Sequence, residues 1–290
     1  MHGINSSSAS INDGIEFLTH LFHNKGMKYS SLNQARCALS LFIHTHNNIT
    51  FGNTDLVKRF MTGAFKLRPS FPRYTTTFDV SIVLQHLKLL ETDTLNLKDL
   101  SLKLITLLSL LTGQRNQSLA TLETDQMVQD NEKITFFIPT VVKTTKPNKH
   151  IPPLVLKKYP FERDLCPVRL INRYLQQTTL LRQGERKLFL SYKKPHKAVV
   201  TTTLARWCKT TLQAAGVNVD IFKAHSIRGA STSKAEVRGL SLLDINKAAG
   251  WSNSCSTFAR FYQKPIVSNF GEVILNPEVI CAGFLLSMSR

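Results

Sequence analysis

Hydrophobic residues recur at the spacing of an α-helix through most of this chain of 290 residues. The pattern is repeated across residues 11–68 and predicts three or four helices there, and it returns in the strongly apolar residues 80–90 and 95–111. Residues 125–153 differ, because short β-like runs alternate with polar or proline-containing turns. We therefore expect a mainly α-helical protein with one small antiparallel β-sheet, which is an α+β fold.

A short segment rich in proline and arginine divides the helical pattern into two parts. Residues 67–74 read LRPSFPRY, a composition typical of a linker. We predict an N-terminal helical domain over residues 1–68, a linker over residues 69–76 and a larger domain over residues 77–290. The end of this domain, residues 277–290, is a further apolar segment for which the sequence offers no obvious packing partner.

The charge of the chain is strongly positive and is unevenly distributed. There are 37 basic and 19 acidic residues, a formal net charge of +18. Residues 141–210 contain 16 of the basic residues and only 3 of the acidic ones. Lysine and arginine concentrated in this way predict a surface that contacts a polyanion, above all a nucleic acid.

Neither cysteines nor apolar runs point to a secreted, metal-binding or membrane protein. The five cysteines are far apart and form no C-x-x-C pair, which argues against a disulfide framework and a structural zinc site. No signal peptide is evident, and no apolar run approaches the ~18 residues that span a bilayer. We expect no membrane partner, no metal site and a protein inside the cell.

Residues 223–265 are divided by their capping residues into three short predicted helices. Gly239 ends the first helix, and Ser241 with Asp244 three residues later predicts the start of the second. Gly250 ends the second helix, and Pro265 stops the third.

These three helices carry four side chains that suit chemistry at a phosphodiester. Tyr262 can attack phosphorus and form a covalent phosphotyrosine, and Arg228 can hold two phosphate oxygens in a planar fork. His225 can exchange protons near neutral pH, and the indole N–H of Trp251 can donate to a phosphate oxygen. Each also has an ordinary explanation: a helix-capping histidine, a surface ion pair, or aromatic residues of the core.

The motifs around these residues resemble the signature of the tyrosine recombinase, or phage integrase, family. They are the H-x-x-R of His225 and Arg228, the G-W that ends at Trp251 and the F-Y that ends at Tyr262. Residues 112–115 read T-G-Q-R, which resembles the first arginine box of the family and would make Arg115 its first phosphate-binding arginine. Taken alone, Arg115 is better explained as an exposed arginine near a helix end, and only its order with the later motifs favours the phosphate-binding role.

The resemblance also implies a catalytic lysine on a β-hairpin. Lys143, in VVKTTKPNKHIPP, stands at the corresponding place, and Lys146 or Lys149 could take the role instead. The implied catalytic set is therefore Arg115, Lys143, His225, Arg228, Trp251 and Tyr262. We further expect DNA contacts from the basic residues Lys146, Lys149, Lys193, Lys194 and Arg206.

What the resemblance implies for fold and function is specific. It implies an N-terminal helical domain that clamps DNA and a tyrosine-recombinase catalytic domain. The activity would be that of a site-specific DNA recombinase or integrase, and we favour one encoded by a mobile element. It would cleave and rejoin strands through a covalent 3′-phosphotyrosine, without metal, ATP or any other cofactor. Double-stranded DNA would be the partner of a homotetramer assembled on paired sites, in the nucleus of a eukaryote or the cytoplasm or nucleoid of a prokaryote.

Two departures from the family pattern keep other functions open. Ser118 occupies a place where the family usually has an acidic residue, and the interval between Trp251 and Tyr262 is longer than is commonest. One alternative is a DNA-binding protein that derives from such a recombinase but no longer cuts. Another is a type IB topoisomerase-like enzyme, and a third, based on charge alone, is an RNA-binding or ribosomal-type protein.

Overall fold

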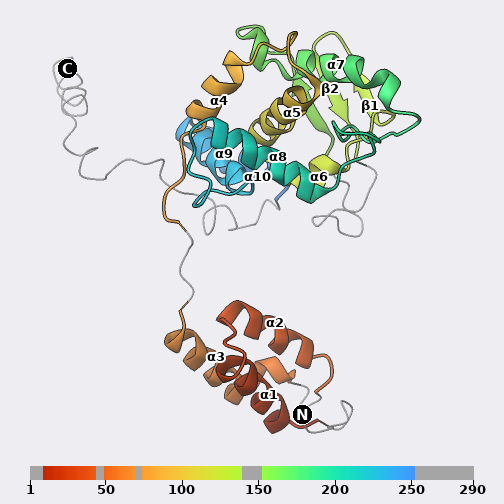
Figure 1. Cartoon of the computed structure of the whole chain (residues 1–290). Helices are drawn as coiled ribbons and strands as arrows, with labels where there is room; N and C mark the ends of the chain where they lie inside the picture. The colour runs from red at the N-terminus through yellow and green to blue at the C-terminus, as the bar shows by residue number, and fades with distance from the viewer. Residues whose placement is uncertain (1–8, 44–48, 70–73, 139–151, 252–290) are drawn as a thin grey trace, which may run out of the picture. The chain divides into compact units, whose positions relative to one another are not determined.

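The computed structural model describes residues 9–43, 49–69, 74–138 and 152–251 (Figure 1). The chain forms two compact units, Met1–Arg73 and Tyr74–Arg290. The described residues are mostly helical and include one three-stranded antiparallel sheet, so the predicted fold class is confirmed. No helix within these ranges is long and apolar enough to cross a membrane.

The N-terminal unit packs three α-helices around a small apolar core. They are α1 (Ile11–His23), α2 (Tyr29–Leu39) and α3 (Asp55–Leu67), with a short 3₁₀ turn at Phe51–Asn53. Helix α1 begins at a capping box in which the Ser10 and Asp13 side chains satisfy each other's backbone N–H groups. At the far end of α3, Arg68 donates to the carbonyl oxygen of Phe22 at 2.6 Å and lies over its ring, which ties α3 to α1.

In the second unit, the helix α5 (Leu97–Thr112) runs through the centre (Figure 1). Its residues are nearly all apolar or small, and they are buried along almost the whole helix. It contacts the helices α4 (Val80–Leu89), α7 (Pro167–Thr178), α8 (Thr201–Ala214) and α9 (Ser226–Val237). Two shorter helices, α6 (Asn116–Ala120) and α10 (Leu242–Ala248), follow α5 and α9 in the chain. The buried position of α5 fixes the loop at its C-terminal end, which becomes part of the site.

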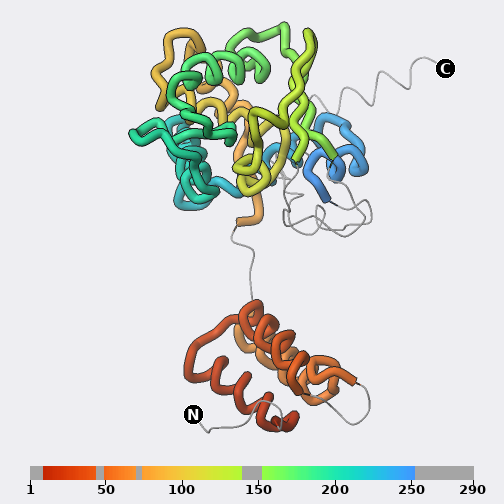
Figure 2. The backbone as a smooth tube through the Cα atoms, turned by 90° about the vertical axis from the view of Figure 1, so that its right-hand side faces the viewer, coloured from red at the N-terminus to blue at the C-terminus, as the bar shows by residue number. Residues whose placement is uncertain are grey.

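The small sheet has the strand order β1-β2-β3, and its antiparallel strands lie side by side in both views (Figures 1 and 2). The strands are β1 (Met127–Gln129), β2 (Lys133–Phe136) and β3 (Leu154–Lys157). Ile134 pairs with Leu156 and Phe136 with Leu154, and these four side chains face the core.

Two strand predictions need correction. The predicted sheet stretch ended at residue 153, whereas β3 lies just beyond it, where the side chains alternate between buried and exposed. The apolar residues 188–190 also predict a short strand from the sequence alone, but the structure has only an isolated bridge between Leu190 and Ala198, because the chain turns back within a few residues. The β-like runs predicted at residues 141–142 and 150–151 lie outside the described residues.

Candidate active site

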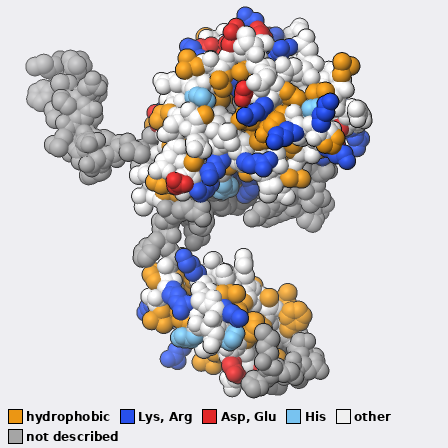
Figure 3. Space-filling view, in the orientation of Figure 1, with side chains coloured by type: hydrophobic (Ala, Val, Ile, Leu, Met, Phe, Trp, Pro, Cys, Tyr) orange, Lys and Arg blue, Asp and Glu red, His pale blue; other side chains and the backbone are white. Residues whose placement is uncertain are grey.

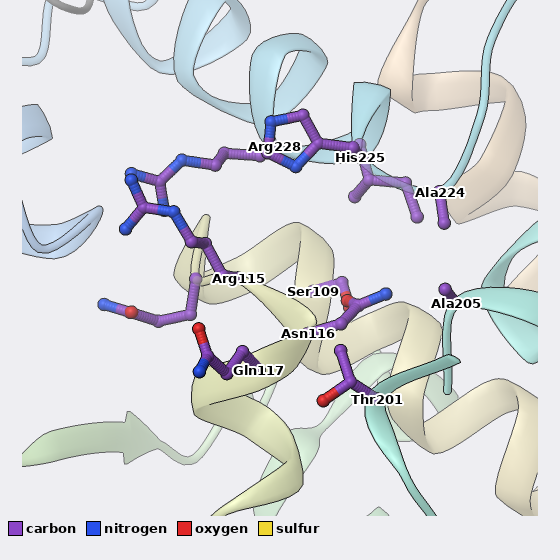
Figure 4. Close-up of a pocket in the computed structure, with 11 residues that line it drawn as sticks. Ser109, Arg115, Asn116, Gln117, Thr201, Ala205, Ala224, His225 and Arg228 are labelled. Carbon is purple, nitrogen blue, oxygen red and sulfur yellow. The ribbon is translucent and has the colours of Figure 1, made fainter. Parts of the chain in front are cut away.

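A cavity of about 260 Å³ opens where three helix termini of the second unit meet (Figure 4). The loop from α5 to α6 contributes Gln114 and Arg115, the residue before α9 contributes His225, and α9 itself contributes Arg228. Thr201, the first residue of α8, closes another side. Segments that are more than 100 residues apart in the sequence therefore share one pocket.

Arg115 is directed into this pocket by the way α5 ends. Gly113 adopts a left-handed conformation, with φ of +57°, and stops the helix. Arg115 follows as the N-cap residue of α6. It does lie at a helix end, as the simpler explanation has it, but it also lines the pocket. Ser118 is buried, and within the described residues no carboxylate forms an ion pair with Arg115.

His225 precedes the first residue of α9 and is exposed to the pocket. Its side chain makes no capping hydrogen bond to the helix, which excludes the explanation of a helix-capping histidine. The neighbouring Ser226 is fixed by Tyr74, because the two hydroxyl oxygens lie 2.9 Å apart. Tyr74 and Phe78 both pack edge-on against Phe222, so the turn before His225 rests on an aromatic cluster.

Arg228 is 2% exposed, which excludes a surface ion pair as its role. It lies one helical turn after His225, and its Nη1 donates to the carbonyl oxygen of Gly113 at 2.7 Å. In Figure 4 the guanidinium groups of Arg115 and Arg228 point toward the same region of the pocket. Two positive charges directed at one point would repel each other, and an anion placed there would relieve that repulsion.

The ring of Trp251 packs against the guanidinium group of Arg228. Helix α10 starts as predicted, with the Ser241 side chain accepting from the N–H of Asp244, and it ends at Gly250, whose φ is +68°. Trp251 follows at 7% exposure, and its ring centroid lies 4.2 Å from Cζ of Arg228. The residue is therefore part of a small core and also a cation–π platform for the arginine.

The remaining predicted residues do not line the pocket or lie outside the described ranges. Tyr262, Lys143, Lys146 and Lys149 belong to the undescribed part of the chain. Lys193 and Lys194 are exposed on a turn that is held against α8 by stacking of Tyr192 on Trp207. Arg206 is exposed on α8 itself, and Figure 3 shows Lys and Arg side chains gathered over this helix. Lys193, Lys194 and Arg206 are thus exposed basic residues on α8 and on the turn packed against it, and α8 also contributes Thr201 and Ala205 to the pocket.

Several polar residues of the pocket were not predicted from the sequence: Gln114, Asn116, Gln117 and Thr201. The first three flank Arg115 in the chain, so the arginine motif itself could have pointed to them. Nothing in the sequence indicated that the start of α8 would face the same cavity, since this depends on how α8 packs against α5 and α6.

The polar groups of the pocket favour an anion with several oxygen atoms. Two guanidinium groups, an imidazole and side-chain amides face the cavity, and none of the described residues that line it is acidic. Arginine forks match the geometry of phosphate oxygens. Among the described residues, no group of three or more His, Cys, Asp or Glu side chains could hold a metal ion.

Comparison with known proteins gives one family and a set of similar folds. The sequence model of the phage integrase family matches residues 82–265. The solved structure of XerH site-specific recombinase bound to its difH substrate superposes with a TM-score of 0.59 at 14% identity, covering 94% of this chain and 72% of that chain. None of the curated protein sequences matches this chain.

Two further structures share the fold. The Tn1549 transposon integrase in complex with transposon right end DNA has a TM-score of 0.59 at 14% identity, covering 96% of this chain and 87% of that chain. A lambda integrase tetramer bound to a Holliday junction has a TM-score of 0.52 at 14% identity, covering 88% of this chain and 64% of that chain. At such identities the likeness is one of fold, and it confirms the predicted recombinase-type catalytic fold.

Proposed function

The chain belongs to the phage integrase family of tyrosine recombinases, and from this premise we propose that it cleaves and rejoins DNA strands through a covalent 3′-phosphotyrosine. Family and fold together support site-specific recombination as its role. The observation that carries the chemical proposal is the meeting of Arg115, His225 and Arg228 at one pocket. An anion-binding pocket built from these motifs is what phosphoryl transfer requires.

In the proposed cleavage step, the phenolic oxygen of Tyr262 forms a bond to phosphorus and the bond to the 5′ oxygen breaks. Negative charge accumulates on the non-bridging oxygens in the transition state, where Arg115 and Arg228 would stabilise it. The burial of Arg228 strengthens this interaction, because water screens it poorly.

Proton transfer accompanies both bond changes. The Tyr262 hydroxyl must lose its proton, for which we assign His225 as the acceptor, and the leaving 5′ oxygen must gain one, for which we assign Lys143 as the donor. His225, which is exposed in the pocket and not used for capping, is suited to exchange protons at the phosphate oxygens. Trp251 would donate its N–H to the phosphate and keep Arg228 in place.

Rejoining reverses these steps with a different strand. A 5′ hydroxyl attacks the phosphotyrosine, the new phosphodiester forms and Tyr262 is released. The phosphodiester bond energy is conserved in the intermediate, so the proposed reaction needs neither ATP nor a metal ion. Lambda integrase forms a tetramer on a Holliday junction, and we propose a homotetramer on paired double-stranded sites here, with the N-terminal unit completing the clamp on DNA.

The departure at Ser118 favours a second candidate, a recombinase-derived protein that binds DNA without cutting it. A family position that is usually acidic carries a buried serine, and no described carboxylate pairs with Arg115. A weakly supported arginine would bind phosphate but orient it less well for attack.

A covalent-trapping assay decides between these functions. The protein is incubated with a pool of nicked suicide duplexes in chelator, and denaturing gels are used to detect a DNA-linked protein band. We expect a band that disappears in Tyr262→Phe and persists in the matched variant Tyr159→Phe, whose half-exposed ring does not line the pocket. Relaxation of supercoiled plasmid without strand exchange would identify a topoisomerase-like enzyme. Salt-sensitive binding without any band, using a pool that contains the bound site, would identify the silent DNA-binding protein.

A further inference from the structure

The side chain of Gln114 completes the C-terminal cap of α10. A helix ends with four carbonyl groups that have no partner within the helix. In α10 the first three are bonded by the backbone immediately after it: Ala249 to Ile245 at 2.9 Å, Trp251 to Asn246 at 2.8 Å and Gly250 to Lys247 at 3.2 Å. The fourth, the carbonyl of Ala248, accepts from Nε2 of Gln114 at 2.6 Å. The last cap therefore comes from the T-G-Q-R motif, which is distant in the sequence.

Two glycines in the left-handed conformation, Gly113 and Gly250, lie beside this contact. Gly250 has a φ of +68°, and a Cβ added there would lie 3.5 Å from the amide of Gln114. A Cβ on Gly113 would face Thr232 of α9 at 3.5 Å and Ala249 at 3.9 Å. The Gly113–Gln114 segment is thus inserted between α9 and the end of α10, with the Gln114 amide against Gly250.

The contacts around this segment connect Gln114, the end of α10, Trp251 and Arg228, and lead back to Gly113. Gln114 holds Ala248, and three residues later the Trp251 ring lies 4.2 Å from Cζ of Arg228. Arg228 in turn donates to the carbonyl oxygen of Gly113, the residue that precedes Gln114. Moving the end of α10 would therefore move the aromatic support of Arg228 while leaving its bond to Gly113 in place.

We propose that Gln114 is a positioning residue, which sets the place of Trp251 and, through it, the orientation of the Arg228 guanidinium. The inference rests on the proposed function, because it assigns this guanidinium to the scissile phosphate. Groups that support a reactive side chain from behind control its geometry, and a displacement of about 1 Å can cost on the order of 100-fold in rate. An amide is needed at this position: leucine has no donor, and glutamate would face the Ala248 carbonyl with an oxygen.

Three variants test the role of the amide. Gln114→Leu and Gln114→Glu remove the donor to Ala248. Gln177→Leu is the matched control, because the Gln177 amide of α7 donates to the carbonyl of Leu95 at 2.9 Å, away from the pocket. Each full-length protein is compared with the parent for duplex affinity, for the rate of covalent trapping and for thermal stability.

A spectroscopic arm reports the position of Trp251 directly. The chain has two tryptophans, and in a Trp207→Phe background the emission comes from Trp251 alone. At 7% exposure this ring should emit at short wavelength and resist quenching by acrylamide. Both properties are measured without DNA, so they do not depend on catalytic activity.

We expect both Gln114 variants to bind duplex within about twofold of the parent and to form the covalent adduct about 10–100-fold more slowly. Their Trp251 emission should shift to longer wavelength and become easier to quench. Gln177→Leu should lose thermal stability while keeping the parental adduct rate and emission. An adduct rate equal to that of the parent in Gln114→Leu, or equal slowing in Gln177→Leu, would overturn the inference. If the parent itself forms no adduct, the proposed function fails, and an unchanged Trp251 emission in Gln114→Leu would overturn the positioning role as well.

Discussion

Nη1 of Arg228 donates a hydrogen bond to the carbonyl oxygen of Gly113 at 2.7 Å, across 115 residues of sequence. This bond joins the two arginine motifs, because Gly113 lies two residues before Arg115. The left-handed turn at Gly113 orients both its own carbonyl and the chain that leads to Arg115. The two proposed phosphate-binding arginines are therefore parts of one packed unit.

Arg228→Lys should remove activity while keeping most of the DNA affinity. A lysine ammonium cannot donate to Gly113, stack on Trp251 and fork two phosphate oxygens at once. We expect duplex binding within a few-fold of the parent, covalent trapping slower by at least about 100-fold, and a lower melting temperature from the buried, imperfectly bonded charge. Filter binding, the trapping assay and calorimetry measure the three quantities.

The control for this variant is Arg182→Lys. Arg182 is partly buried and, like Arg228, donates hydrogen bonds to backbone carbonyls, those of Lys187 and Leu188. Unlike Arg228, it does not line the pocket. It should lose stability without losing trapping rate per folded molecule. Equal trapping rates in Arg228→Lys and the parent would contradict the role assigned to Arg228.

A buried lysine, Lys103, should make the free energy of unfolding change with pH in the alkaline range. Lys103 of α5 is fully buried, and its Nζ donates to the carbonyl of Leu90 and to Oγ1 of Thr92. Burial lowers the pKa of Lys103 to about 8, although the Asp164 carboxylate 3.7 Å away opposes the shift. In the unfolded chain the lysine keeps its ordinary pKa of about 10.5.

The direction of the pH effect on the free energy of unfolding follows from the number of protons that each state binds. Between about pH 8 and 10.5 the unfolded state holds a proton that the folded state has released, so the free energy of unfolding contributed by Lys103 rises with pH through this window. In urea denaturation from pH 7 to 10.5, the free energy of unfolding should rise more steeply with pH in the parent than in Lys103→Met. Cys208, whose pKa burial raises to about 11, acts in the opposite direction but is present in both proteins and cancels. Identical pH slopes in the two proteins would contradict the prediction.

Local signals in the sequence predicted the elements of the site well. The Ser241–Asp244 cap and the left-handed glycines at helix ends act within a few residues, so their effect is visible in the sequence. The hydrophobic periodicity predicted the apolar helix α5, which is buried along almost its whole length. Strand β3 was missed because four residues of alternating pattern follow a proline-rich stretch that resembled a turn.

Contacts between distant segments could not be predicted from the chain. Gln114 reaches Ala248, and Thr201 reaches the pocket, only because α8, α9 and α10 pack around the end of α5. The T-G-Q-R motif identified Arg115 as a candidate phosphate-binding residue. That no described carboxylate pairs with Arg115 depends on tertiary packing and could not be predicted. The resemblance to a family supplied the order of the motifs, and the structure supplied the distances.

The hydroxyl of Tyr74 should stabilise the start of α9 by a measurable amount. Its oxygen lies 2.9 Å from Oγ of Ser226, the first residue of that helix. Tyr74→Phe keeps the ring against Phe222 and removes only the hydrogen bond, so we expect a loss of about 1 kcal/mol in the free energy of unfolding. Ser226→Ala should cost a similar amount, and the double variant should cost less than the sum of the two. Additive losses in urea denaturation would show that the two hydroxyls are not coupled.

The basic turn beside α8 should contribute to the salt dependence of DNA binding. Lys193 and Lys194 are exposed, and neither forms an ion pair with a described carboxylate. Each phosphate neutralised on duplex DNA changes the slope of log K against log salt concentration by about 0.9. Replacing both lysines with glutamine should therefore make the slope shallower by about two, with affinity reduced almost equally for every sequence.

Lys88→Gln is the matched control for this prediction. Lys88 on α4 forms an ion pair with Glu162 at 2.6 Å, so its charge is already compensated within the protein. Fluorescence anisotropy titrations from about 50 to 200 mM salt measure the slope for the parent and for both variants. A slope in the double variant equal to that of the parent would place Lys193 and Lys194 away from the phosphates. A shallower slope only in the double variant would identify this turn as part of the DNA-facing surface, because loss of a compensated charge elsewhere has no counterion effect.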